Sequence, residues 1–118
     1  MQDVVIVNGA RTPVGRFGGA FKDIRASGLG TIAIKAALER SGVAPELVAE
    51  VIMGNVLQAA GTGYPARRAA LSAGIPDSVP AMTVNRACSS GLEAINLAVM
   101  SIMTGESEIV VAGGADSM

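Results

Sequence analysis

The chain has 118 residues, so it holds one domain at most, because domains typically run about 100 to 200 residues. Half of the residues are apolar and only 16% are charged, against roughly 25% in an ordinary soluble domain, which predicts that some apolar surface meets another protein surface. The net charge is −1 and no stripe of Lys and Arg is present, so a nucleic-acid partner and an anionic membrane surface are excluded.

The sequence predicts neither a membrane span nor a targeting segment. The start lacks a basic region, and the charge-free stretch 94–105 is shorter than the ~20 apolar residues of a membrane span. The single cysteine, Cys88, cannot form an internal disulfide, and without any histidine the usual Cys/His zinc sets are impossible. We therefore expect a soluble cytoplasmic protein with no bound metal.

Strand and helix patterns alternate along the chain. The run 4–7 is continuously β-branched, as is typical of a strand buried on both faces of a parallel sheet. Gly42 lies where a left-handed cap would end the first helix, and Pro45 opens a short turn. The predicted strands are 4–7, 51–56, 81–85 and 109–112, and the predicted helices are 27–40, 66–73 and 90–104.

This order predicts a doubly wound α/β fold, βαβαβαβ, with a mainly parallel sheet and helices on both faces. In the last helix, an apolar stripe is predicted along Leu92, Ile95, Val99, Ile102 and Met103. The sheet is expected to keep at least one unpaired edge.

The stretch 84–93 carries the most chemical information. Here a strand turns sharply into a helix and Cys88 lies at the turn, so its sulfur is predicted to be exposed at the carboxyl end of the strand, beside the first backbone N–H groups of the helix. Ser90 and Glu93 also match a capping box. This placement is typical of a nucleophile.

An ordinary thiol is only ~3% ionised at pH 7, and a helix N-terminus supplies at best ~2 kcal/mol of the ~2.7 kcal/mol needed to ionise it. A nucleophilic Cys88 therefore needs a further partner, and the chain has no histidine to offer. The alternative is that Cys88 is an inert core residue, as most free cysteines are.

Four blocks in the chain resemble the thiolase family, the acyl-CoA acetyltransferases. The segment 85–92, Asn-Arg-Ala-Cys-Ser-Ser-Gly-Leu, is similar to the family's N-x-x-C-x-S-G-[LM] nucleophile motif. The other three blocks are Arg-Thr-Pro-Val-Gly at 11–15 with Phe-Gly-Gly at 17–19, Gly-Asn-Val-Leu-Gln-Ala at 54–59 with Pro-Ala-Arg at 65–67, and Gly-Gly-Ala-Asp-Ser-Met at 113–118. Gly63-Tyr64 replaces the Gln-Asn that the family usually has before Pro-Ala-Arg.

The resemblance implies that residues 1–118 are an incomplete amino-terminal thiolase domain, without the rest of a thiolase chain. It further implies that Cys88 takes an acyl group from an acyl-CoA, for Claisen condensation to a 3-ketoacyl-CoA or for the reverse thiolysis. Coenzyme A thioesters would be substrates, with no tightly bound cofactor, and the protein would be a homo-oligomer. In the family, a histidine, a second cysteine and an asparagine-held water assist this cysteine, and none has a counterpart here, so the 118 residues alone are expected to be inactive.

Three alternatives remain open at this stage. The run 87–90 also suits the Ala-Cys-Ser-Ser elbow of the ketoacyl synthases, although Asn85 and Gly91 favour thiolase. The pattern Gly61-x-Gly63-x-x-Ala66 fits a dinucleotide fingerprint, but the acidic ribose ligand expected ~20 residues further on is missing. A non-catalytic interaction module, binding another chain through exposed apolar surface, would explain the low charge.

Overall fold

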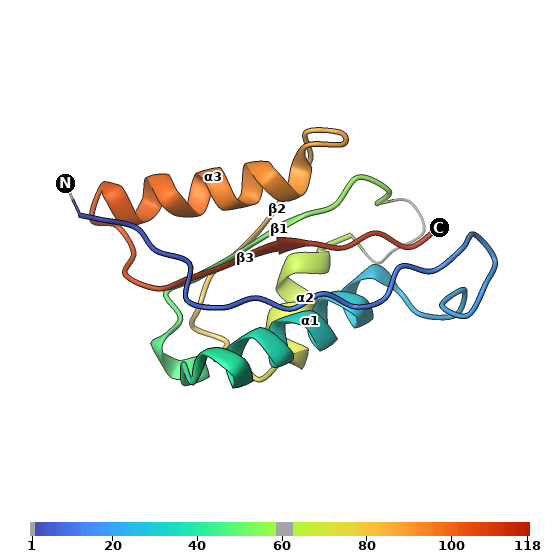
Figure 1. Ribbon diagram of the computed structural model, residues 1–118, viewed down its shortest axis with the longest axis horizontal. Helices are drawn as coiled ribbons and strands as arrows, with labels where there is room; N and C mark the ends of the chain where they lie inside the picture. The colour runs from blue at the N-terminus through green and yellow to red at the C-terminus, as the bar shows by residue number, and fades with distance from the viewer. Residues whose placement is uncertain (1, 59–62) are drawn as a thin grey trace.

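The computed structural model describes residues 2–58 and 63–118 and arranges them as a sheet between layers of helices. Figure 1 shows α1 and α2 on one face of the sheet and α3 on the other, so the predicted α/β fold with helices on both faces is confirmed. The elements in chain order are α1 (Ala26–Ser41), the short 3-10 helix η1 (Pro45–Leu47), β1 (Glu50–Gly54), α2 (Pro65–Ser72), β2 (Ala81–Val84), α3 (Ser90–Met103) and β3 (Val110–Gly114).

The sheet is parallel, in the order β2-β1-β3. Ile52 of β1 lies opposite Met82 of β2 and Ala112 of β3. The chain moves from β1 outward to β2 and then returns past β1 to β3. Because right-handed crossovers are strongly preferred, this reversal of direction places α2 and α3 on opposite faces. The carboxyl ends of all three strands meet at the edge where ligands bind in open α/β sheets.

The central strand β1 divides the core in two. Val51 and Met53 pack against the α1 and α2 side, whereas Ile52 packs against α3. Val51 and Ile52 are almost fully enclosed, as a parallel strand covered on both faces requires. At the end of α1, Gly42 adopts φ 69° and its N–H donates to the Glu39 carbonyl, as predicted for a left-handed cap.

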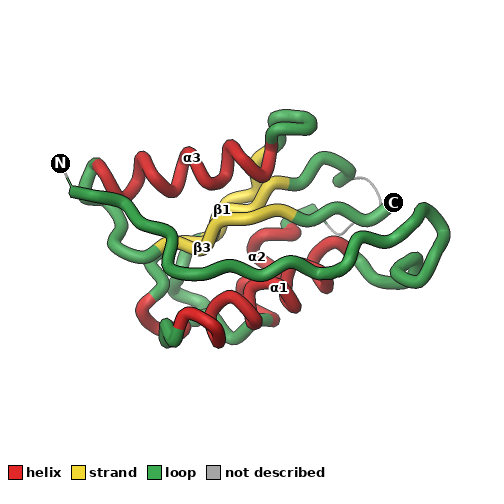
Figure 2. Tube along the Cα trace, viewed as in Figure 1, coloured by secondary structure: helices red, strands yellow, loops and turns green. Residues whose placement is uncertain are grey.

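The predicted first strand is wrong. Residues 4–7 run as an unpaired coil in Figures 1 and 2, and Ile6 is 82% exposed. The following residues are attached to the end of α1 instead, because Asn8 donates to the Arg40 carbonyl and Arg40 donates to the Gly9 carbonyl. A β-branched run favours an extended backbone, but pairing also depends on where the neighbouring residues are attached, which the local pattern cannot specify.

The predicted apolar stripe of α3 does not face the sheet. The buried residues of this helix are Ser90, Ala94, Ala98 and Ser101, whereas Leu92 is 63% exposed. Small side chains allow the helix to approach the sheet closely, and Ala94 and Ala98 pack with Ile52 of β1. Leu97 packs partly against this cluster, whereas Leu92, Ile95, Met100 and Met103 are left exposed on the outer surface. In the described part of the chain, none of the helices has the length and apolarity needed to cross a membrane.

Two strand-end glycines let α3 begin directly over the sheet. A Cβ on Gly54 would lie 2.5 Å from the carbonyl carbon of Ser90 and 2.7 Å from the backbone nitrogen of Gly91. A Cβ on Gly114 would lie 3.5 Å from the Cα of Gly91. Since the atoms met by a Gly54 Cβ are backbone, they cannot rotate away. The start of α3, two residues after Cys88, is thus held against the carboxyl end of β1.

We expect Gly54→Ala to lower the free energy of unfolding by roughly 1 to 3 kcal/mol, because a methyl group would overlap the α3 backbone. The matched control is Gly91→Ala, on the other side of the same contact, whose added Cβ meets nothing within 4 Å. That substitution should be neutral or stabilising by up to about 1 kcal/mol, since alanine favours the helix. Urea unfolding measures both, and equal effects of the two would contradict the packing argument.

Candidate nucleophile elbow

Cys88 lies in the short turn between β2 and α3, and its side chain is exposed, as predicted. The residue before it, Ala87, has φ 49° and is the one non-glycine residue with positive φ in the described part of the chain. A left-handed alanine costs of order 1 to 3 kcal/mol and persists only where surrounding contacts hold it. The turn 85–90, here called the elbow, is therefore a strained segment that presents the thiol to solvent.

Hydrogen bonds from neighbouring side chains hold the elbow. The Ser90 hydroxyl accepts a hydrogen bond from the Arg86 N–H at 2.7 Å and donates one to the Ala87 carbonyl at 2.6 Å. The Asn85 side-chain oxygen accepts a hydrogen bond from the Ala87 N–H at 3.1 Å. Ser90 is buried, so its two bonds are partly shielded from water. Both peptide groups of Ala87 are thus fixed.

The predicted capping box is wrong. The N-cap of α3 is Ser89, which makes no side-chain cap bond, and Ser90 is the first helical residue. The Ser90 hydroxyl bonds to the Arg86 N–H and the Ala87 carbonyl within the elbow, so it does not cap the helix. The Glu93 carboxylate instead accepts a hydrogen bond from the Arg86 guanidinium in an ion pair of 2.8 Å. Since the Arg86 side chain is 69% exposed, this pair contributes at most about 1 kcal/mol.

A second cluster ties the ends of β1 and β3 together beside the elbow. One oxygen of Asp116 accepts hydrogen bonds from the backbone N–H groups of Val56 and Leu57, both at 2.9 Å, and from the Asn55 amide at 3.2 Å. The same amide donates to the Ala115 carbonyl at 2.8 Å. Asn55 is 2% exposed, and these two acceptors fix which end of its side chain is nitrogen.

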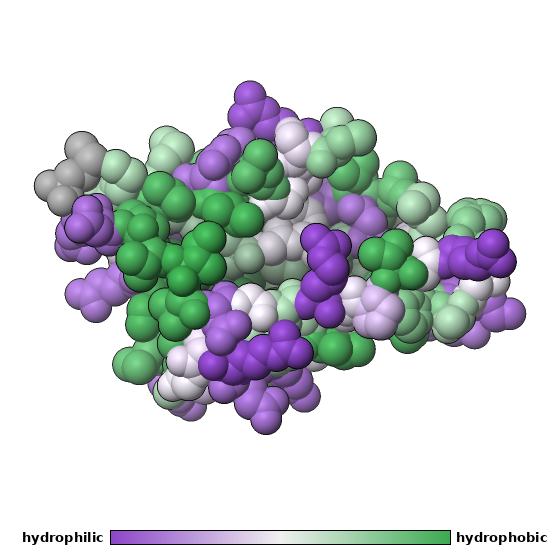
Figure 3. Space-filling model, in the orientation of Figure 1, coloured by the Kyte–Doolittle hydropathy of each residue, from purple (hydrophilic) through white to green (hydrophobic). Residues whose placement is uncertain are grey.

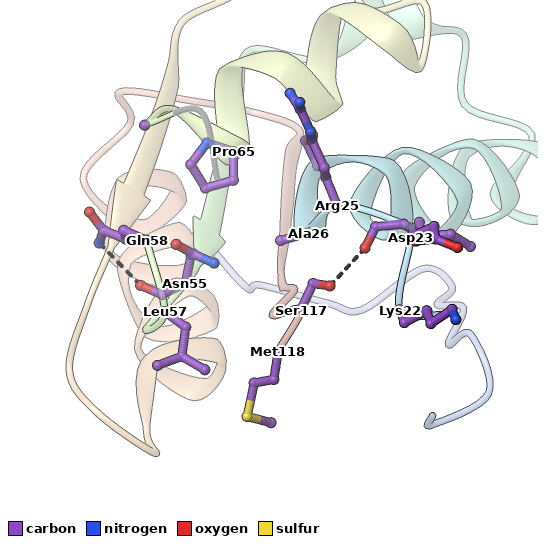
Figure 4. Close-up of a pocket in the computed structure, with 13 residues that line it drawn as sticks. Lys22, Asp23, Arg25, Ala26, Asn55, Leu57, Gln58, Pro65, Ser117 and Met118 are labelled. Atoms are coloured by element: carbon purple, nitrogen blue, oxygen red, sulfur yellow. Dashed lines mark hydrogen bonds between the residues drawn. The ribbon is translucent and has the colours of Figure 1, made fainter. Parts of the chain in front are cut away.

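A cavity of about 260 Å³ opens at the carboxyl ends of β1 and β3. Figure 4 shows Asn55, Gln58 and Pro65 on one side of it and Ala26 and Ser117 on the other. The Asn55 side-chain oxygen is the one buried side-chain polar atom without a hydrogen-bond partner among the residues that the structure describes. A second, open hollow is lined by Asn85 of the elbow, but Cys88 lines neither space.

Three of the four sequence blocks meet at this edge of the sheet, because they follow β1, β2 and β3. The remaining block, 11–19, lies in the amino-terminal coil, and its Phe17 lines the open hollow. Arg67 has a structural role in α2, where its guanidinium donates to the carbonyls of Val79 and Asp77 at 2.9 Å. Ala59 of the second block lies outside the described residues.

Comparison with known proteins identifies the family of this arrangement. The sequence model of the family described as thiolase, N-terminal domain, matches residues 4–118. The chain belongs to the thiolase family. An acetyl-CoA acetyltransferase of Cupriavidus necator is 59% identical over all 118 residues, which make up 30% of that protein. A probable acetyl-CoA acyltransferase of Staphylococcus aureus is 51% identical over the whole chain, again 30% of that protein.

A solved thiolase-family structure has the same fold. The crystal structure of the Bacillus anthracis acetyl-CoA acetyltransferase superposes with a TM-score of 0.89 at 46% identity, over 93% of this chain and 28% of that one. The chain therefore spans about 30% of the length of the curated relatives it matches. The family match favours the thiolase interpretation over the ketoacyl-synthase and dinucleotide-binding alternatives. Gly61 of the dinucleotide pattern lies outside the described residues.

Sequence reasoning found Cys88 but missed the residues that hold its turn. Asn85, Ser90 and Asp116 all occur in the blocks that resemble thiolases, yet no pattern assigns them a contact. One usable signal was present. Asn85 stands two residues before Ala87, the spacing at which an Asn side chain bonds to the backbone of a turn.

We expect Ser90→Ala to lower the free energy of unfolding by about 1 to 3 kcal/mol, because it removes two partly buried hydrogen bonds and leaves the Arg86 N–H unpaired. The neighbouring Ser89→Ala is the control. Ser89 is exposed and its hydroxyl donates only to the Arg86 carbonyl, so its loss should cost less than about 1 kcal/mol. Urea unfolding measures the free energy of unfolding of both variants. Equal losses in the two variants would contradict the role assigned to Ser90.

Proposed function

We propose that Cys88 is the acyl-accepting nucleophile of a thiolase that acts on coenzyme A thioesters, with no tightly bound cofactor. The observation that carries the proposal is an exposed thiol on a strained turn at the start of α3, at the carboxyl edge of a parallel sheet, in a chain of the thiolase family. Relatives named acetyl-CoA acetyltransferase support the substrate class.

The proposed reaction has two bond exchanges at the Cys88 sulfur. The thiolate attacks the carbonyl carbon of an acyl-CoA, a sulfur–carbon bond forms, and the bond to the coenzyme A sulfur breaks, so that coenzyme A leaves as a thiolate. A second acyl-CoA, which has lost its α-proton to a base, then attacks the acyl carbon through its α-carbon. A carbon–carbon bond forms, the bond to Cys88 breaks, and a 3-ketoacyl-CoA is released.

The backbone of the elbow offers one group to the tetrahedral intermediate. Within the described chain, the N–H of Cys88 donates no hydrogen bond, so it is free to donate to the developing oxyanion. Loss of one such donor typically slows acyl transfer by about 10² to 10³-fold. The fixed conformation of Ala87 sets the direction of this N–H together with that of the thiol, which couples nucleophile and oxyanion donor in one turn.

Turnover needs groups beyond those described here. The chain has no histidine to act as a base on the thiol, and the Glu93 carboxylate is engaged in the ion pair with Arg86. We therefore assign to these 118 residues the nucleophile and one oxyanion donor, and to the remaining length of a thiolase the base that ionises Cys88 and the base that moves the α-proton.

The proposal is tested by exchanging this chain for the corresponding 118 residues of the Cupriavidus necator acetyltransferase, to which it is 59% identical. The chimera should catalyse thiolysis of acetoacetyl-CoA. Cys88→Ala should lower kcat by at least about 10⁴-fold, as loss of a covalent nucleophile does in other acyl-transfer enzymes. The isolated chain should show no turnover with the same substrate.

The control is Ser72→Ala on the exposed end of α2, which should leave kcat within about twofold, since exposed substitutions away from a site change little. A folded chimera that keeps its activity without Cys88 would refute the assignment of the nucleophile. A folded but inactive chimera would favour the alternative that this chain is a non-catalytic interaction module.

We also propose that the protein is a cytoplasmic homo-oligomer. Within the described residues, β2 and β3 leave both sheet edges unpaired, and Val5, Ile6 and Val7 are 65 to 82% exposed. Figure 3 shows apolar side chains gathered on the face near the amino terminus. Exposed apolar side chains gathered on one face are typical of a surface that contacts another protein surface. A lone cysteine without a disulfide partner suits a reducing compartment.

Self-association should be visible by sedimentation velocity, with the weight-average mass rising with concentration. Ile6→Lys should weaken it by placing a charge on the apolar segment, whereas Ser72→Lys, exposed on α2, should not. A monomer at every concentration would contradict the oligomer proposal and leave the assignment of Cys88 untouched.

A further inference from the structure

The Asn85 side chain connects the elbow to the loop that follows β1. Its oxygen accepts a hydrogen bond from the Ala87 N–H at 3.1 Å, and its nitrogen donates to the Val56 carbonyl at 3.5 Å. The first bond closes a turn around Arg86 and fixes the peptide group that enters Ala87. The second bond is long. It still sets the orientation of the amide, because the oxygen faces a donor, the Ala87 N–H, and the nitrogen faces an acceptor, the Val56 carbonyl.

The Val56 peptide is itself held from the other side. Its N–H donates to Asp116 at 2.9 Å, and the same carboxylate oxygen accepts the Leu57 N–H and the Asn55 amide. Asp116 follows β3, Val56 follows β1 and Asn85 follows β2. Residues 60 positions apart in sequence are thereby joined in one hydrogen-bonded path, from Asp116 through Val56 and Asn85 to the residue before Cys88.

From this path we infer that Asn85 and Asp116 are positioning residues for Cys88. They hold Ala87 in its left-handed conformation and so fix the thiol and the Cys88 N–H relative to the ends of the three strands. Neither side chain needs to touch substrate. The inference rests on the proposed role of Cys88 as acyl acceptor, but its physical content, that these two side chains maintain the elbow, can be measured without any acyl transfer.

Glycine at position 87 supplies the decisive comparison. Glycine adopts positive φ without the steric cost that alanine carries, so a turn built on glycine does not need Asn85 to hold it. If Asn85 acts through the conformation of Ala87, then Ala87→Gly should compensate for the loss of Asn85. If Asn85 contributes only general stability, the effects of the two substitutions should add.

The readout is hydrogen–deuterium exchange of the Ser90 amide, followed by NMR on the 118-residue chain. This N–H donates to the Ala87 carbonyl at 3.1 Å and touches neither substituted side chain, and Ser90 is buried. Asn85→Leu should speed its exchange by about fivefold or more, the effect of losing one net hydrogen bond from a local opening equilibrium. Asn85→Leu with Ala87→Gly should return the rate to within about twofold of the original.

Asp116→Ala should act in the same direction as Asn85→Leu and be compensated by the same glycine, whereas Asp116→Asn, which keeps an acceptor oxygen, should have a smaller effect. The amide of Ile52 in β1 is the internal standard for global unfolding. Its exchange should speed by no more than that of Ser90, because a bond lost on local opening is also lost on global unfolding. An unchanged exchange rate at Ser90 in Asn85→Leu, or no compensation by Ala87→Gly, would overturn the inference.

In the chimera, Asn85→Leu should lower kcat with KM within about twofold, and Ala87→Gly should restore kcat, since the positioning acts on the nucleophile and not on substrate binding. The two proposals can fail separately. A chimera without activity, combined with the expected exchange rates, would refute the role of Cys88 and keep the positioning role. An active chimera in which Asn85→Leu leaves the exchange rate of the Ser90 amide unchanged would keep the role of Cys88 and refute the positioning role.

Discussion

The close approach of α3 to the carboxyl ends of β1 and β3 is the constraint on which the rest of the structure depends. Gly54 has no side chain where the backbone of Ser90 and Gly91 passes, and Gly114 leaves room beside it. Any larger residue at Gly54 would push the helix away from the sheet. Because the elbow is the connection between β2 and α3, the position of this helix start decides where Cys88 can lie.

The second requirement is a sharp turn between two elements that are already fixed. The chain must pass from the end of β2 into α3 within five residues, and it does so with a left-handed alanine. Such a conformation costs of order 1 to 3 kcal/mol, whereas a single hydrogen bond contributes about 0.5 to 1.5 kcal/mol. One bond would not hold the turn, but the bonds from Asn85 and Ser90 to the peptide groups of Ala87 together offset the cost.

The arrangement separates the placement of the nucleophile from its activation. The described residues supply an exposed thiol, a free backbone N–H beside it and a rigid support, while the cation Arg86 is paired with Glu93. A support of this kind is useful to an acyl-transfer enzyme because reacting groups must be held within a fraction of an ångström of the productive geometry. In the proposed enzyme the bases come from elsewhere in a thiolase. A rigid elbow would keep the Cys88 sulfur in one position relative to them.

The sequence alone determined the α/β class, the bounds of all three helices to within one residue or so, and the turn that carries Cys88, because hydrophobic periodicity and the Gly and Pro signals are local properties. It predicted a strand at residues 4–7, and there only the tertiary structure decided that the segment stays unpaired, since hydrogen bonds with Arg40 attach Asn8 and Gly9 to the end of α1. The buried face of α3 was likewise decided by packing: alanines face the sheet because the glycine contact brings the helix too near for Leu92 or Ile95. The path from Asp116 to Ala87 joins three strand ends, and hydrogen bonds between residues so far apart in the chain exist only once the sheet has brought those ends together.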